Sequence, residues 1–228
     1  NSFTLLYRGK SYIHLFQWED ASACLEQLLS FESENVSAWY YRGLCLSQLV
    51  RHRDALEAFD NVLKRDESCT PAWFNRAREL SILKRYDESL PAFDRALELA
   101  SPLQNNNTTT DIWICKGTAF HELERYHEAI DAFERSLALS PDNITAWYHK
   151  GKSFLSLAKY RDAITCFEQV ISRDEHCAGA WLKKASPAKP AAEPSAPAAA
   201  RVFEARGFRT GTDGGKVKVS PGLEFAAR

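Results

Sequence analysis

An internal repeat is the feature that most limits the fold of this 228-residue sequence. Five of its six tryptophans recur at intervals of 34, 40, 34 and 34 residues. They are Trp39, Trp73, Trp113, Trp147 and Trp181. With each tryptophan at position 4 of a unit, the units start at residues 36, 70, 110, 144 and 178, and a further unit fits at residue 2. A period of this length predicts a solenoid of stacked repeats, in which each unit buries its apolar side against its neighbours.

The aligned units predict two helices in every repeat. Apolar positions 4, 8 and 11 have helical spacing, as do positions 20, 24 and 28, and a short polar turn separates the two stripes. Position 24 holds a large apolar residue in each complete unit: Leu25, Phe59, Phe93, Phe133 and Phe167. Positions 8 and 20 hold Gly, Ala or Ser. We expect these small residues to let the two helices approach closely beside the large side chain.

With Trp at position 4, Gly at 8, Ala at 20 and Phe at 24, the unit resembles the tetratricopeptide repeat. Residues 38–43 and 146–151 are similar to its microbial Trp-Tyr-x-Lys-Gly type. The departures are Leu5 for Trp, Ala77 for Gly, and an Asn/Thr-rich insertion at 104–109, which we expect to lengthen a loop. The resemblance covers residues 2–177. It implies an all-α fold, a right-handed α-α superhelix (TPR solenoid) of five complete repeats plus the start of a sixth.

The pattern ends near the C-terminus. The unit that starts at 178 stops after Lys184, so the array 2–184 lacks a polar capping helix, and we expect it to continue in a longer parent protein. Residues 185–200 form a Pro/Ala linker. Residues 201–228 are a basic, Gly-containing tail with a net charge of +3, against −4 for residues 1–184. We interpret this tail as disordered, as foreign sequence, or as a segment that docks into a groove of the array.

The sequence has no motif for catalysis or for a cofactor. Residues 210–217 fail as a phosphate-binding loop, because Thr210 and Val217 stand where Gly and Ser/Thr are needed. The six cysteines contain no Cys-x-x-Cys, and the six histidines have no metal-ligand spacing. We therefore expect no enzymatic activity, no cofactor and no metal. Free thiols, and the lack of a signal peptide or of a stretch of roughly 20 apolar residues, favour a cytoplasmic protein without membrane contact.

The family resemblance also implies a binding surface. In this family the first helix of each repeat lines the concave wall of the superhelix. The predicted groove residues lie beside the apolar stripe of that helix: Tyr40, Tyr41, Leu44, Phe74, Asn75, Arg78, Ile114, His121, Tyr148, His149 and Lys152. Rings at position 5 of the repeat are candidate anchors for a bound peptide or helix. The alternative is that position 5 only extends the packing of the core.

These features predict a non-enzymatic scaffold or adaptor for a protein or peptide partner. The chaperone carboxylate clamp of the family is not expected, because only Asn75 matches its residues in the best window and Asp111 would repel a carboxylate. The net charge of −4 argues against helical-repeat RNA binding. Self-assembly is a further alternative, in which the uncapped face at Trp181 stacks on a second copy.

Overall fold

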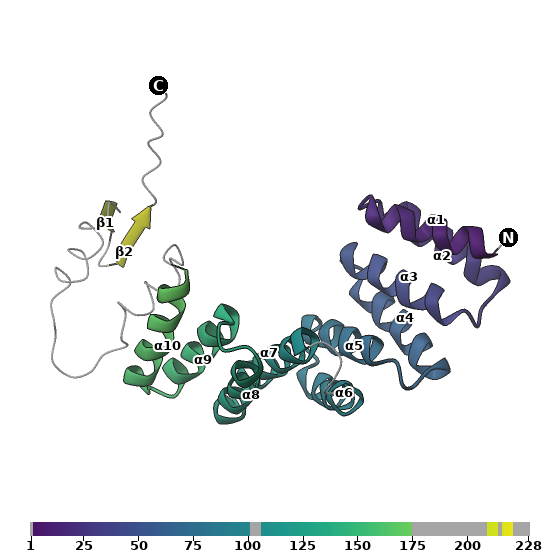
Figure 1. The fold of residues 1–228 in the computed structure, drawn as a ribbon. Coiled ribbons are helices and arrows are strands. Elements are labelled where there is room, and N and C mark those ends of the chain that lie inside the picture. The colour runs from purple at the N-terminus through teal and green to yellow at the C-terminus, as the bar shows by residue number, and fades with distance from the viewer. Residues whose placement is uncertain (1, 101–105, 175–208, 214–215, 221–228) are drawn as a thin grey trace, which may run out of the picture.

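The computed structural model of the protein describes residues 2–100, 106–174, 209–213 and 216–220. Within the first two ranges the helices follow one another in a curved row, with α1 at one end and α10 at the other (Figure 1). Their bounds are α1 Ser2–His14, α2 Trp18–Phe31, α3 Val36–Gln48, α4 His52–Arg65, α5 Thr70–Ile82, α6 Tyr86–Leu99, α7 Asn106–Glu122, α8 Tyr126–Leu139, α9 Ile144–Ser156 and α10 Tyr160–Arg173. The predicted all-α repeat superhelix is confirmed for this part of the chain.

Each repeat is a pair of neighbouring helices joined by a tight turn. The residue at position 15 of the repeat has a left-handed backbone in all five pairs: Phe16, Val50, Lys84, Glu124 and Ala158, with φ between 58° and 61°. The next amide closes the turn on the carbonyl five residues earlier, as in Arg51 N to Leu46 O at 2.9 Å. This bond pattern ends the first helix in the Schellman manner. It sends the chain back along the second helix at the same point in every pair.

The insertion between the third and fourth repeats differs from the loop that the sequence predicts. Helix α7 begins at Asn106 and has 17 residues, whereas the other first helices, α1, α3, α5 and α9, have 13. Most of the Asn/Thr tract therefore forms an additional turn at the start of α7. Asn and Thr are weak helix formers, but the extra turn continues a helix that is already anchored by its packing.

The core repeats with the helices. Phe59, Phe93, Phe133 and Phe167 are all fully buried, as is Leu25 at the same position of the first repeat. The rings lie against the small residue at position 8 of their own repeat. A Cβ atom placed on Gly117 would lie 2.6 Å from Cε1 of Phe133. Close approach of the ring to the helix backbone therefore explains the glycine.

Gly117→Ala is expected to lower the free energy of unfolding by about 2 kcal/mol, because the ring of Phe133 must shift in a close-packed site. The matched control is Gly9→Ala, where the nearest atom, in Leu25, would lie 3.1 Å from the new Cβ. In the Gly9→Ala variant, the higher helix propensity of alanine offsets most of the loss in the free energy of unfolding. Urea unfolding followed by circular dichroism measures both variants. Equal losses in the two repeats would contradict the steric explanation.

The described part of the tail contains a β-hairpin. Strands β1 (Arg209–Asp213) and β2 (Lys216–Ser220) pair antiparallel, with Arg209 opposite Ser220 and Asp213 opposite Lys216. This regular structure departs from the expectation that residues 201–228 are disordered. A Gly-Gly pair between two strands is a typical hairpin signal, and the Lys-Val alternation after it has strand periodicity. The predicted start of a sixth repeat and the Pro/Ala linker lie outside the described residues.

Candidate binding groove

The first helices of the repeats pack side by side, since α7 contacts both α5 and α9, and α1 contacts α3. We define the groove face as positions 2, 5, 6, 9, 12 and 13 of these helices. A cavity of about 450 Å³ opens on this face between α5 and α7. Its lining residues are Arg78, Ser81, Ile82, Tyr86, Cys115, Thr118, Ala119 and Glu122. Positions that the sequence places on one face therefore come together across the junction of the third and fourth repeats.

The cavity is largely apolar with a charge of each sign at its rim. Arg78 comes from α5 and Glu122 from α7, while Ile82 is 48% exposed. Tyr86 lines the cavity from α6. Sequence reasoning missed Tyr86, because it assigned the groove to first helices only. This arrangement suits an apolar side chain of a ligand flanked by polar groups.

The surroundings of two ionisable groups in the cavity favour their neutral forms. Burial raises the pKa of the Cys115 thiol to about 11, although the nearby Arg78 acts in the opposite direction. Burial also raises the pKa of Tyr86, and the charge of Glu122 adds to the effect. Both groups stay protonated at neutral pH. The cavity therefore offers a thiol and a phenol as neutral contacts, without a thiolate nucleophile.

The rings at position 5 pack against the core of their own repeat. Tyr40 lies 6.1 Å from Phe59, Phe74 lies 6.3 Å from Phe93, and Tyr148 lies 6.0 Å from Phe167, measured between ring centroids. Ile114 is buried, with 9% of its surface exposed, in a cluster with Phe133 and Ala146. The predicted groove position of Ile114 is therefore a core position. The packing interpretation of position 5 describes these contacts better than free anchors do.

Several other predicted residues are engaged in contacts within the array. Asn75 donates from Nδ2 to the Pro71 carbonyl at 2.9 Å and lies 3.4 Å from the Tyr40 hydroxyl. His149 stacks on Phe133 at 5.9 Å, and His121 Nδ1 lies 2.9 Å from Ser153 Oγ. Leu44 packs against the cluster around Phe59. These side chains shape the groove wall. Arg78 and Lys152 are the predicted residues with fewer such contacts, whereas Tyr41 packs against the core cluster around Leu25 and Leu28.

The groove face continues into the first repeat, which the sequence analysis left out. Phe3 and Tyr7 are 66% and 51% exposed on α1, with ring centroids 4.3 Å apart. Lys10 Nζ lies 5.3 Å from the Tyr7 ring centroid and 4.7 Å from that of Tyr41. These residues occupy positions 2, 6 and 9 of a repeat that lacks the marker tryptophan. Alignment of the first repeat with the others would have placed these residues on the groove face.

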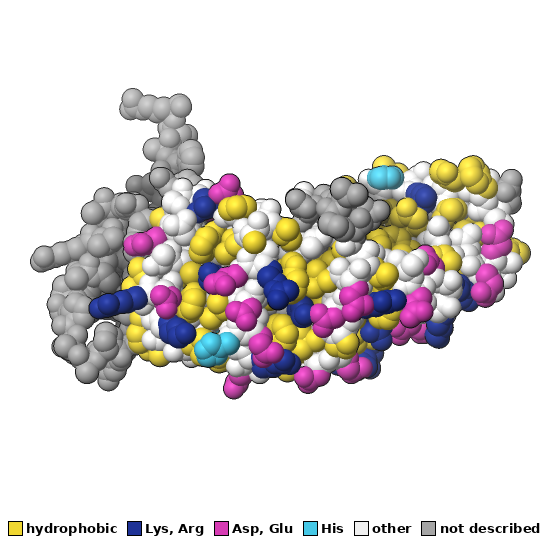
Figure 2. Space-filling view, turned by 60° about the horizontal axis from the view of Figure 1, so that its bottom comes forward, with side chains coloured by type: hydrophobic (Ala, Val, Ile, Leu, Met, Phe, Trp, Pro, Cys, Tyr) yellow, Lys and Arg dark blue, Asp and Glu magenta, His cyan; other side chains and the backbone are white. Residues whose placement is uncertain are grey.

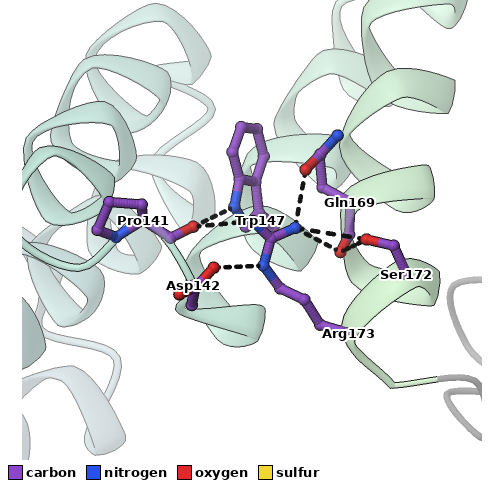
Figure 3. Close-up of polar contacts among 6 residues, drawn as sticks. All are labelled: Pro141, Asp142, Trp147, Gln169, Ser172 and Arg173. Atoms are coloured by element: carbon purple, nitrogen blue, oxygen red, sulfur yellow. Dashed lines mark hydrogen bonds and ion pairs between the residues drawn. The ribbon is translucent and has the colours of Figure 1, made fainter.

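The recurring tryptophans serve the architecture of the array. Trp39, Trp73 and Trp147 each donate from Nε1 to the carbonyl six residues earlier, at 2.7 to 2.9 Å. Figure 3 shows the last of these bonds, from Trp147 to Pro141, beside Arg173, whose Nε donates to Asp142 at 3.0 Å. Each indole thus fixes the loop that enters its own repeat. This contact gives the tryptophan the same structural role in the second, third and fifth repeats.

Cations at position 7 join each repeat to the one before it. Their carboxylate partners lie at position 25, on the second helix of the preceding repeat. The pairs are Arg42–Glu26, Arg76–Asp60, Lys116–Asp94 and Lys150–Glu134. Each cation also lies over the tryptophan of its own repeat, 5.2 to 5.8 Å from a ring centroid. These ion pairs stabilise the stacking of neighbouring repeats. Sequence analysis missed them, because it followed apolar columns only.

A buried carboxylate marks the junction of the second and third repeats. Glu79 on α5 is 2% exposed. It accepts a hydrogen bond from Ser47 Oγ at 2.6 Å and lies 2.8 Å from His52 Nδ1. The other first helices have Ser, Cys or Ala at this position. A carboxyl group can be buried here because two partners from the preceding repeat satisfy it.

The surface of the array carries both signs of charge. Figure 2 shows Lys and Arg side chains interspersed with Asp and Glu among hydrophobic ones on the face in view. In the part of the chain that the structure describes, no three His, Cys, Asp or Glu side chains gather in the manner of a metal site. Among the same residues, no helix combines the length and the apolar character that crossing a bilayer requires.

Solved structures share this fold. PilW, a widely conserved type IV pilus biogenesis factor, aligns with a TM-score of 0.74 at 24% identity over 90% of this chain and 91% of its own. MamA 41-end from Desulfovibrio magneticus RS-1 aligns with a TM-score of 0.71 at 19% identity over 78% and 97%. YrrB, described as a TPR protein with an unusual peptide-binding site, aligns with a TM-score of 0.58 at 18% identity over 80% and 85%.

Comparison with protein-family models agrees with the repeat architecture of the structure. Residues 18–49, which contain α2 and α3, match the Protein prenyltransferase alpha subunit repeat. No curated protein matches the chain. Residues 67–142 and 144–177 both match the Tetratricopeptide repeat. Together with the stacked helix pairs and their tryptophan contacts, these matches show that the chain belongs to the tetratricopeptide repeat family.

Proposed function

We propose that this chain is a non-enzymatic scaffold that holds a peptide or helix of a protein partner along its groove face. The observation that carries the proposal is the cavity between α5 and α7, whose lining combines apolar side chains with Arg78 and Glu122. Apolar anchors in a preformed groove, oriented by a few polar groups, are the usual basis of peptide recognition. The array supplies the rigid backbone that such a site needs.

The aromatic rings on the groove face of the first two repeats support a longer site. Phe3, Tyr7 and Tyr41 extend the aromatic surface away from the cavity and along the same face. Tyrosine is favoured in binding surfaces, because its ring gives apolar contact and its hydroxyl a hydrogen bond. A partner segment would therefore contact several repeats. The peptide-binding site named for YrrB is consistent with this use of the fold.

The alternative functions have less support. Tail docking in the groove is not favoured by charge, because the groove face carries Lys10, Arg78 and Lys152 against Asp111 and Glu122, and the tail 201–228 is itself basic. A nucleic-acid reader would need a larger cationic surplus. Self-assembly through the face at Trp181 stays a hypothesis, because that residue lies outside the described part of the chain. Light scattering tests it directly.

Panning a displayed library of random 16-residue peptides against the full chain tests the proposal. Ile82→Ser is expected to weaken the best binder by about tenfold, which corresponds to losing one anchor contact of about 1.4 kcal/mol. The matched control is Val50→Ser, since Val50 is also an exposed aliphatic residue, at 72%, but lies in the turn between α3 and α4. Fluorescence anisotropy measures both dissociation constants. Equal effects of the two substitutions would count against the groove.

Tyr40→Ala with Tyr148→Ala is a poor test of binding, although both residues are predicted groove anchors. Their rings pack on Phe59 and Phe167, so truncation also removes core contacts. Loss of partner binding in that double variant would not distinguish a damaged fold from a lost contact.

A further inference from the structure

We infer that the groove face selects acidic segments: the partner places carboxylates against Lys10, Arg78 and Lys152 and apolar side chains between them. This inference rests on the proposed function and specifies the chemistry of the ligand. All three cations stand at position 9 of their repeat, on α1, α5 and α9. The second and fourth repeats have Leu44 and Thr118 at this position. Positive charge therefore recurs at every second repeat along the groove.

The cations at position 7 of the second to fifth repeats differ from those at position 9 in their partners. Those at position 7 of the second to fifth repeats each have a carboxylate of the preceding repeat within 3.5 Å. Lys10, Arg78 and Lys152 have no ion pair with any residue of the described ranges. The first group stabilises the stack. The second group keeps its charge available for a ligand.

Aromatic rings hold two of these charges in place. Lys10 Nζ lies between the rings of Tyr7 and Tyr41, and Arg78 Cζ lies 5.7 Å from the centroid of the Phe74 ring. A cation on a ring loses side-chain freedom without losing its charge. An incoming carboxylate therefore meets an ordered partner, and the entropy cost of forming the ion pair falls.

The distribution of charge sets this face apart from the rest of the array. Residues 1–184 have a net charge of −4. On the groove face, Lys10, Arg78 and Lys152 face Asp111 and Glu122, a net of +1, so the remainder carries −5. Both acidic groups belong to α7. The first three repeats have two cations and no carboxylate on this face, so we place the ligand's acidic groups mainly there. Glu122 favours an apolar or neutral ligand group at the far rim of the cavity.

The spacing of the cations limits the ligand further. Packed helices lie about 8–10 Å apart, so the two repeats between Lys10 and Arg78 span roughly 16–20 Å. An extended peptide covers this distance with about five or six residues at ~3.3 Å each. A fitting segment has two acidic residues at about that interval with apolar residues between them. A further apolar residue follows for the cavity beside Ile82. Three cations at such wide intervals match peptide carboxylates better than a phosphate backbone, which carries one charge per nucleotide.

The test compares two variants of equal charge in the peptide panning described above. One is the groove triple variant Lys10→Gln, Arg78→Gln, Lys152→Gln. The other changes three exposed cations of the second helices and their turns: Arg53→Gln, Lys159→Gln and Arg161→Gln. Peptides selected on the unchanged chain are expected to be enriched in Asp and Glu. Their dissociation constants are expected to rise at least tenfold in the groove variant and less than twofold in the control. Asp→Asn and Glu→Gln changes in the peptide reproduce the loss.

The outcomes separate this inference from the proposed function. Selected peptides without acidic enrichment, whose binding still depends on Ile82, would overturn the inference and leave the groove as the binding site. Peptides whose binding is insensitive both to Ile82→Ser and to the groove triple variant would overturn both. Equal losses in the two triple variants would show a nonspecific effect of net charge and also overturn the inference. Tighter binding of a single-stranded oligoribonucleotide than of any selected peptide, lost in the groove variant, would assign the cations to nucleic acid instead.

Discussion

Phe133→Ala is expected to lower the free energy of unfolding by about 3–5 kcal/mol, the usual cost of emptying a fully buried aromatic site. The ring of Phe133 is completely buried between α7 and α8, where it contacts the backbone at Gly117 and supports His149 on α9. Its removal leaves a cavity at a junction that two repeats share. Urea unfolding measures the loss.

Phe133→Leu is the matched control, because Leu25 fills the same position in the first repeat and is also fully buried. We expect this variant to lose less than half as much as the alanine variant. Because contacts in the array run between neighbouring repeats, hydrogen exchange should accelerate in α7 to α9 and change little in α1 and α2. Uniform acceleration along the array would contradict this local effect.

Glu79→Ala is expected to cost about 2–3 kcal/mol. The substitution removes a buried acceptor that Ser47 and His52 share, and hydrogen bonds to charged groups contribute about 1.5–3 kcal/mol each. Part of the loss is recovered, because His52 and Ser47 are only half-buried and can be hydrated. Thermal and urea unfolding of the full chain both report the change.

The chain contains its own template for rescuing this variant. At the next junction, the equivalent positions hold Ala119 and Tyr86 in place of Glu79 and His52. The double variant His52→Tyr, Glu79→Ala copies that apolar junction. We expect it to be at least 1 kcal/mol more stable than Glu79→Ala alone, because a hydrophobic replacement of a whole buried polar pair is often neutral or stabilising. A double variant that is less stable than either single one would show that the acidic group packs in a way that Tyr86 does not reproduce.

Most of the fold could be predicted from the sequence, because one physical rule repeats along it. The ring at position 24 and the small residue at position 8 must pack together in every unit, so the columns of Phe133 and Gly117 report the helix pairs directly. The start of α7 was missed because Asn and Thr have low helix propensity, while packing of the rest of the helix decides the outcome. The hairpin was missed because five-residue strands carry a weak periodic signal.

The candidate site was harder to predict, because side chains on one helical face divide their contacts between core, neighbour and solvent. Position 5 lies on the groove side of the helix. Nevertheless, Tyr40 and Tyr148 pack against phenylalanine rings of the core, and Ile114 is buried. A single sequence gives the face of a residue and not the depth of its side chain. By contrast, Lys10 could have been predicted as a groove residue from the sequence, since it shares position 9 with Arg78 and Lys152.

The two kinds of contact between repeats have different consequences for the order of the units. The pairing of position 7 with position 25 is nearly the same at each junction, so it accepts any repeat as a neighbour. Glu79 is more selective. It is satisfied by Ser47 and His52, whereas the first repeat would offer it Ile13, which has no polar side-chain atom, and Trp18, which has a single donor in its indole N–H. One acidic residue thus disfavours misregistered stacking, in which the third repeat docks on the wrong neighbour during folding or in exchange between two chains.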